Sequence, residues 1–329
     1  MKLERVRTHM AEQDLDALVV RAPDNVLYLT NFWGMKGYDV VIFPREGEPV
    51  LIALEPSQAD AERMAWTGDI RLFKGYDERD PRPPQARALE LAAEAAKAYD
   101  RIGLELSLGT QASDRMVGEP TTYTHEWFHA FGTNVDDATP LLNRARALKT
   151  EQELERMRLA NELAARAMEH VRDALVPGMT ESQAAALWEG YVHGEGTGFQ
   201  GRVELALGFS LVWSGPGIRT FTATGDRPVQ ANEPTLFEIW VCADGYWADH
   251  TKNLVPGELT ERYRELEVGL LGVYDAAVAF CTPGASLPEL DRRIRAGIAD
   301  LGFPGQPTRM RRSSSARLAP GRQWSTARV

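Results

Sequence analysis

Cysteine is scarce in this chain, and so are long apolar runs and any excess of basic residues. Only two of the 329 residues are cysteines. Cys242 and Cys281 are far apart in apolar surroundings, which favours buried free thiols over a disulfide or a zinc site. No apolar run reaches the ~18 residues of a transmembrane helix, and the charged amino terminus is not typical of a secretory signal. The net charge of −10 argues against nonspecific nucleic-acid binding. We therefore expect a cytoplasmic protein with neither a nucleic-acid nor a membrane partner.

Histidine is also scarce, with six residues in the chain and none after His250. The segment HEWFH, residues 125–129, matches the HExxH pattern, in which two histidines on one helix face bind zinc. That chemistry needs a helix and a third ligand downstream, whereas Gly118, Pro120 and Gly132 flank the segment closely. We interpret HEWFH as a packing or surface segment. No phosphate-binding glycine loop or Ser-His-Asp order is evident in the sequence.

The most informative feature is a pair of carboxylates on the two arms of a predicted hairpin. Residues 236–243 and 246–254 are rich in apolar, aromatic and β-branched residues, and the Asp-Gly pair between them is a strong turn signal. Pairing outward from this turn puts Glu238 and Asp249 on one face, at diagonal positions roughly 7–8 Å apart. Both carboxylates could touch one metal pair. A solvated acidic face is the alternative, which the hairpin taken alone slightly favours because a carboxylate pair is a weak signal.

Other side chains near the hairpin have plainer interpretations. His250 points to the face opposite the second carboxylate, because successive strand residues alternate, so it is not predicted as a ligand. His193 is upstream and could approach the hairpin. Three tryptophans are predicted to be core or pocket wall, and they are Trp213, Trp240 and Trp247.

Residues 1–140 alternate strand-like and helix-like runs. The strand-like runs are 16–20, 38–43, 49–54 and 70–73. The Ala/Glu-rich stretch 85–99 favours helix, and the closely spaced prolines of residues 77–84 predict a loop before it. This alternation predicts an α/β domain.

Residues 141–306 contain an internal repeat. After a Pro-Gly turn, Thr180 and Gln183 form a capping-box pair, and Ser286 with Glu289 repeats that arrangement 106 residues later. A two-fold repeat would build a site between its halves, with coincidence as the alternative. Strands are expected after the first repeat and should also follow the second.

Residues 307–329 break this pattern. They carry six Arg, no acidic residue and no apolar alternation. Such a segment cannot bury enough surface to offset its ordering entropy. The sequence therefore predicts a basic disordered tail or an artefactual end after a frameshift, and a tail for an acidic partner is the alternative.

Three stretches carry a resemblance to a known family. They are LDALVVRAPDNVLYLTNFWG (15–34), LLNRARALKTEQELERMRLANELA (141–164) and the segment from Glu238 through Asp249 to Thr251. The first two are similar to the start of the amino-terminal domain, and to the interdomain linker and first catalytic helix, of Xaa-Pro aminopeptidases, prolidases and creatinases. The third falls where that family has two Asp ligands and a Thr-containing strand. The resemblance covers roughly residues 1–306.

This resemblance implies an α/β amino-terminal domain followed by an α+β pita-bread domain that lacks its last strands. It implies Glu238 and Asp249 as metal ligands and manganese, cobalt or zinc as the cofactor. In such enzymes two metals activate a bridging water and polarise the carbonyl of an Xaa-Pro bond. The implied substrate is a peptide or small molecule, and the implied assembly is a homodimer.

The chain also departs from the family pattern. Glu238 stands where Asp is usual, Phe221 stands where the family places a catalytic His, and no His follows His250 to supply a later ligand. Three readings compete, namely a metal-dependent Xaa-Pro peptidase, a metal-free creatinase-like hydrolase of a small amidino or amide substrate, and a non-catalytic scaffold or incomplete chain. The missing ligands favour a homologue that is inactive or impaired and binds no metal or binds it weakly.

Overall fold

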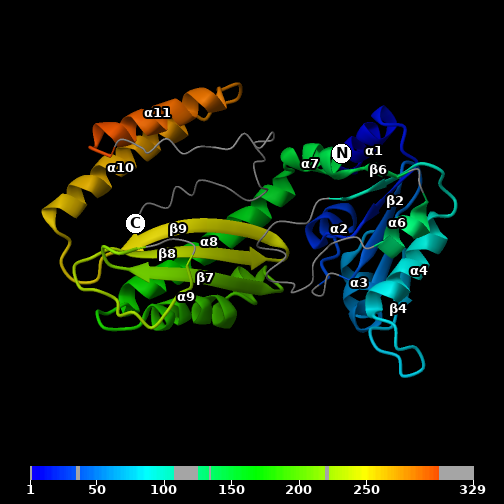
Figure 1. The fold of residues 1–329 in the computed structure, drawn as a ribbon, viewed down its shortest axis with the longest axis horizontal. Coiled ribbons are helices and arrows are strands. Elements are labelled where there is room, and N and C mark those ends of the chain that lie inside the picture. Colours follow the sequence, from blue (N-terminus) through cyan, green and yellow to red (C-terminus); the bar gives the residue numbers. More distant parts are fainter. Residues whose placement is uncertain (1, 35–37, 107–124, 133–134, 219–221, 304–329) are drawn as a thin grey trace.

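The computed structural model describes residues 2–34, 38–106, 125–132, 135–218 and 222–303 (Figure 1). An α/β unit forms the first part of this chain, and a second unit holds a three-stranded sheet backed by helices. Phe221 and the basic stretch 307–329 lie outside the described residues.

The first unit is built on a mixed six-stranded sheet of order β4-β3-β2-β1-β5-β6. Its strands are β1 (Ala17–Val20), β2 (Val40–Pro44), β3 (Val50–Leu54), β4 (Asp69–Phe73), β5 (Ile102–Leu104) and β6 (Val135–Asp137). Strand β2 runs antiparallel to β1 and β3, and the other pairs are parallel. The four expected strands are therefore confirmed. Strands β5 and β6 were not predicted, because three residues are too few to show a period.

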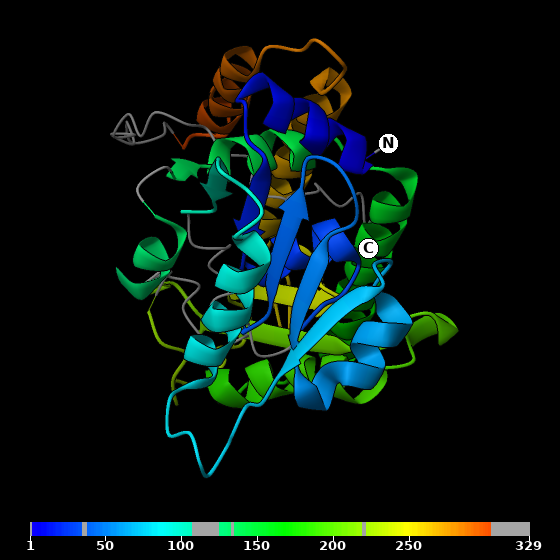
Figure 2. The same ribbon diagram turned by 90° about the vertical axis from the view of Figure 1, so that its right-hand side faces the viewer.

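Helices cover both faces of this sheet. Its central strands are therefore buried on both sides, and they are apolar throughout. They are α1 (Lys2–Glu12), α2 (Pro23–Thr30), α3 (Gln58–Met64), α4 (Pro84–Ala96), α6 (His125–Phe131) and α7 (Thr139–Ala147), with a 3-10 turn η1 at Glu55–Ser57. Leu18 and Val20 of β1 pack with α1, α2 and α7 on one face. Ala17 and Val19 pack with α4 and α6 on the other face. In Figure 2, α4 (cyan) lies in front of the strands of this sheet.

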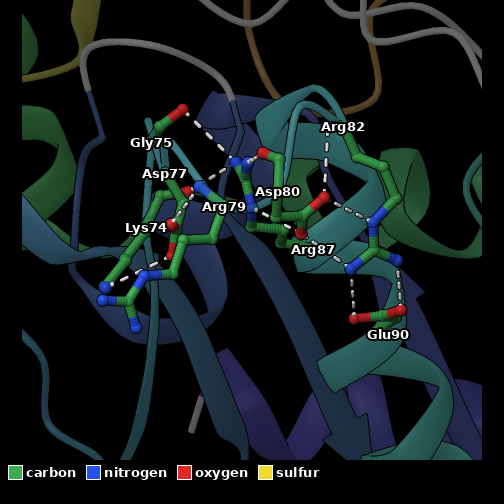
Figure 3. Close-up of polar contacts among 8 residues, drawn as sticks. All are labelled: Lys74, Gly75, Asp77, Arg79, Asp80, Arg82, Arg87 and Glu90. Carbon is green, nitrogen blue, oxygen red and sulfur yellow. Dashed lines mark hydrogen bonds and ion pairs between the residues drawn. The ribbon is translucent and has the colours of Figure 1, made fainter.

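The loop between β4 and α4 is held by an ion network (Figure 3). Arg87 on α4 donates to the carbonyl of Lys74 at 3.0 Å and to the carboxylate of Asp80 at 3.2 Å. Hydrogen bonds from Arg82 hold the pKa of Asp80 below its usual range. Arg82 also pairs with Glu90 on α4. The predicted loop is thus present and tied to the helix that follows it.

The second unit has an antiparallel sheet of β7 (Ala206–Ser214), β8 (Thr235–Ala243) and β9 (Tyr246–Leu254). Helices α8 (Glu151–Ala174) and α9 (Glu181–Glu195) cover one face of it, and a 3-10 turn η2 (Phe199–Gly201) follows α9 (Figure 1). The predicted capping box at Thr180 and Gln183 is confirmed, with 3.0 and 2.9 Å between partner atoms. Each of its two side chains satisfies one otherwise free backbone donor.

Two further helices, α10 (Glu261–Phe280) and α11 (Leu287–Asp300), pack on each other and stand away from the three-stranded sheet (Figure 1). No side chain of either helix is buried. The hydroxyl of Ser286 accepts from the Glu289 N–H as expected, but the Glu289 carboxylate pairs with Arg292 and Arg293 instead of completing a box. Within residues 255–303 the structure has no strand, so the strands expected after the second repeat are not found there.

The two cysteines differ in environment. Cys242 is buried, and burial raises the pKa of its thiol. Cys281 is exposed, so its predicted burial is wrong, because it ends a helix in which no side chain is buried. Across the described part of the chain, no helix has the length and apolar character needed to cross a membrane.

Candidate functional site

The hairpin that carries Glu238 and Asp249 forms with the predicted register. The turn residues Asp244 and Gly245 have φ angles of 49° and 80°, as a type I′ turn requires. Trp240 lies opposite Asp249, and counting from the turn places Glu238 one step along the diagonal. Both carboxylates therefore occupy the same face of the sheet.

That face is the one that α8 and α9 leave open. Phe237, Ile239 and Val241 alternate with Glu238 along β8 and are buried in the core formed with the two helices. Glu238 is half-buried, and so is Asp249 on β9. The alternation of a half-buried sheet thus turns both carboxylates away from the helical layer.

An aromatic pair lies beside the carboxylates. Phe209 of β7, Trp240 of β8 and Asp249 of β9 occupy one row across the three strands. The rings of Phe209 and Trp240 stack with centroids 5.4 Å apart and planes 26° apart. Glu238 lies in the adjacent row of side chains on the same face of the sheet. Trp240 therefore borders both carboxylates and forms, with Phe209, an apolar floor next to them.

The histidines do not join this face. His250 is buried on the helical side, as predicted, with Nε2 2.7 Å from Asn161 Oδ1 of α8. Burial lowers the pKa of His250 to about 4, so it is neutral at pH 7. His193 is exposed on α9, which packs on the opposite face of the sheet, so its expected approach to the carboxylates is wrong.

The segment HEWFH forms the short helix α6, although glycine and proline flank it. Its Trp127 is buried under the guanidinium of Arg21, 4.3 Å from the ring centroid, whereas Glu126 and His129 are exposed. The side chain of His125 lies outside the described atoms. The segment therefore serves packing, as the sequence indicated.

The donor set on the open face does not fit a metal pair. Among the described residues, no group of three or more His, Cys, Asp or Glu side chains could hold a metal ion. Two carboxylates supply too few ligands for a tetrahedral or higher coordination shell without several waters. Whether Glu238 and Asp249 bind any metal stays a prediction.

Glu181 is a structural residue of the site that the sequence did not reveal. It is fully buried and accepts hydrogen bonds from the backbone N–H of Ser214 at 3.0 Å and Gly225 at 3.3 Å. It also pairs with Arg227 at 2.8 Å. These bonds fix the end of β7 and part of the connection to β8. An acidic residue at the first position of a helix is too common to have signalled this role.

The hairpin tip docks against the amino-terminal unit. A Cβ on Gly245 would overlap Leu27 Cδ2 and lie 3.2 Å from the indole of Trp33. Leu27, Trp33 and Cys242 form a small buried cluster across the junction. Arg63 and Glu204 add an ion pair at 2.6 Å. The strand pair with the carboxylates is therefore held at its turn by the other unit.

Comparison with known proteins identifies families that match each of the two units. The model of metallopeptidase family M24 matches residues 155–316, and that of the creatinase/prolidase amino-terminal domain matches residues 2–148. The second unit therefore belongs to metallopeptidase family M24, and the first unit belongs to the creatinase/prolidase amino-terminal domain family. The resemblance seen in residues 15–34 and 141–164 is thus confirmed, and so is an amino-terminal domain followed by an M24 pita-bread domain.

Relatives of known activity and solved structures match over most of this chain. It is 26% identical to an Xaa-Pro dipeptidase of Lactobacillus delbrueckii over 92% of its own length and 78% of the relative's. It is 25% identical to an ectoine hydrolase of Halomonas elongata over 92% and 76%. The Xaa-Pro dipeptidase structure from Bacillus anthracis superposes with a TM-score of 0.70 at 19% identity, covering 92% and 78%. The Pyrococcus horikoshii prolidase gives 0.68 at 19% with the same coverage. Both structures share the fold.

Proposed function

We propose that this chain is an Xaa-Pro peptidase-like member of family M24 whose open sheet face binds a peptide ligand, and that the 329-residue chain alone does not hydrolyse it. The ligand class is supported by relatives that include an Xaa-Pro dipeptidase. Homodimer formation and a cytoplasmic location stay predictions from the sequence.

The observation that carries this proposal is the composition of the open face. Trp240 borders both Glu238 and Asp249 and stacks on Phe209. Aromatic floors bind proline rings well, because the ring is apolar and conformationally fixed. The two carboxylates would attract the amino group of a short peptide. These groups suit binding, whereas a full set of metal ligands is not found among the described residues.

The family implies a divalent metal, which would activate water and polarise the scissile carbonyl. The residues described here do not complete a site for it, so we derive no catalytic step through the metal. Glu238 and Asp249 remain the two residues that would contact a metal if one bound.

A metal-free hydrolase of a small amide or amidino substrate is the second candidate. It is favoured by the similarity to an ectoine hydrolase. The resemblance places Phe221 at the position of the catalytic His in such enzymes, and a phenyl ring can neither accept nor donate a proton. We therefore rank this candidate below the binding protein.

The test is an activity and binding assay on the full chain with alanyl-proline. With manganese, cobalt or zinc added, we expect turnover no higher than that of the Asp249→Ala variant. Metal-dependent turnover that Asp249→Ala abolishes would refute the proposed lack of hydrolysis.

Binding of the same dipeptide can be followed by isothermal titration calorimetry. Trp240→Ala should weaken it by about tenfold, since an aromatic contact contributes ~0.5–1.5 kcal/mol beyond area burial. Trp66→Phe is the control, because Trp66 belongs to the amino-terminal unit. Equal affinity in the wild type and Trp240→Ala would exclude the open face as the binding surface.

A further inference from the structure

A small cavity lies where α2, the junction of α7 and α8, and the tip of the β8–β9 hairpin meet. Its volume is about 40 Å³, and it is partly open to solvent. Each water-sized group needs ~10–15 Å³ of such space, so the cavity has room for about three. Its polar lining includes Asp24, Lys149, Glu153 and Tyr246. The cavity is therefore large enough for the charged end of a small molecule.

Asp24, which lines this cavity, has a buried acceptor oxygen without a donor. Asp24 is only 9% exposed, and its Oδ2 pairs with Arg146 Nη2 at 2.7 Å. Its other oxygen, Oδ1, is buried and has no hydrogen-bond partner among the described residues. A buried carboxylate oxygen without a donor carries an uncompensated desolvation cost. A ligand with an N–H group would remove that cost.

The same cavity also holds unused donors. Lys149 Nζ donates one hydrogen to the carbonyl of Arg146 at 2.6 Å, and within the described residues its other two hydrogens have no partner. Burial, followed by the nearby Arg146, lowers the pKa of Lys149. An anionic group beside Lys149 would oppose both effects. Tyr246 lines the cavity as well, and burial raises the pKa of its hydroxyl, so the hydroxyl stays a neutral donor.

Arg146 and Glu153, the other charged groups of the cavity, make hydrogen bonds of their own. Arg146 bonds Asn25 Oδ1 at 2.5 Å in addition to Asp24. Glu153 Oε2 accepts the backbone N–H of Thr150 at 2.8 Å as part of a capping box. The buried Oδ1 of Asp24 therefore needs a donor, and the ammonium of Lys149 can still donate. Opposite charges at the two ends of a small space match a zwitterion.

We propose that this interdomain cavity binds the main chain of a free α-amino acid, with its ammonium at Asp24 Oδ1 and its carboxylate at Lys149. Leu27 and Met157 provide an apolar wall for the α-carbon side. The cavity lies at the turn of the hairpin, so the ligand would bridge the two units of the chain. This site is independent of the open face proposed to bind peptide.

The experiment is isothermal titration calorimetry of the full chain with three probes of similar size. Glycine carries both charges, glycinamide carries only the ammonium, and acetate carries only the carboxylate. We expect glycine to bind at least about tenfold more tightly than either single-charge probe, because each charged hydrogen bond contributes substantially. Equal binding of acetate or glycinamide, or no binding of glycine, would overturn the proposal.

Variants locate the site. Lys149→Met should weaken glycine binding at least tenfold, and Tyr246→Phe, which removes one hydroxyl, tests the cavity without disturbing an ion pair. Lys97→Met is the matched control, because Lys97 is exposed on the far side of the amino-terminal unit, at the end of α4. Circular dichroism checks that each variant is folded. Unchanged glycine affinity in folded Lys149→Met would place the ligand elsewhere and refute the assignment.

Discussion

Replacing Gly245 with alanine should destabilise the protein more than its backbone conformation alone would require. Gly245 has a φ of +80°, and an added Cβ would overlap Leu27 Cδ2 and approach Trp33. The left-handed conformation costs an L-residue about 1–2 kcal/mol. Forcing a methyl group into a packed contact adds about 1–3 kcal/mol. We therefore expect Gly245→Ala to lower the free energy of unfolding by about 2–5 kcal/mol, measured by urea denaturation.

Gly178 provides the matched control within the same unit. It has a φ of +88°, and a Cβ there would meet nothing within 4 Å, so Gly178→Ala should cost only the ~1–2 kcal/mol of backbone strain. In a Leu27→Ala background the overlap with Leu27 is gone and only the tight approach to Trp33 remains, so the cost of Gly245→Ala should fall toward that of the control. If Gly245→Ala costs no more than Gly178→Ala in the wild-type background, the hairpin tip is not docked on the amino-terminal unit.

Two other predictions concern stability. The folded-state pKa of His250 is lowered to about 4 from an unfolded value near 6.5. The contribution of His250 to the free energy of unfolding is therefore fully present above pH 6.5. It is lost as the pH falls toward 4, by up to about 3 kcal/mol. His250→Gln should flatten the dependence of stability on pH between 6.5 and 4, measured as the urea midpoint. Parallel pH profiles for the wild type and the variant would exclude this role of His250. Amides of α10 and α11 should exchange with solvent faster than those of β2 and β3, since neither helix buries a side chain. Equal protection in a monomer shown by light scattering would contradict this.

Local signals predicted much of the fold. The Asp244-Gly245 turn fixed the register of the hairpin, because a two-residue turn leaves only one pairing of the alternating strands. The capping box at Thr180 likewise depends on neighbours in sequence. Features that depend on distant pairing were missed. The stacking of Phe209 on Trp240 requires the register between β7 and β8, which a long connection separates.

Long-range packing also explains the wrong predictions. Apolar neighbours suggested that Cys281 is buried, but burial depends on what α10 packs against, and no side chain of α10 is buried. His193 shares a helix with core residues, yet that helix covers the face opposite Glu238. Sequence spacing alone does not say which side of a sheet a distant helix will cover.

Metal binding by the full chain tests the central claim most directly. Isothermal titration calorimetry with manganese should give a dissociation constant above about 0.1 mM, because Glu238 and Asp249 supply only two carboxylates. The Asp249→Ala variant should lose at most this weak binding of manganese. Binding of two ions per chain at micromolar affinity, lost in Asp249→Ala, would contradict the account and show that the chain completes the metal centre of its family.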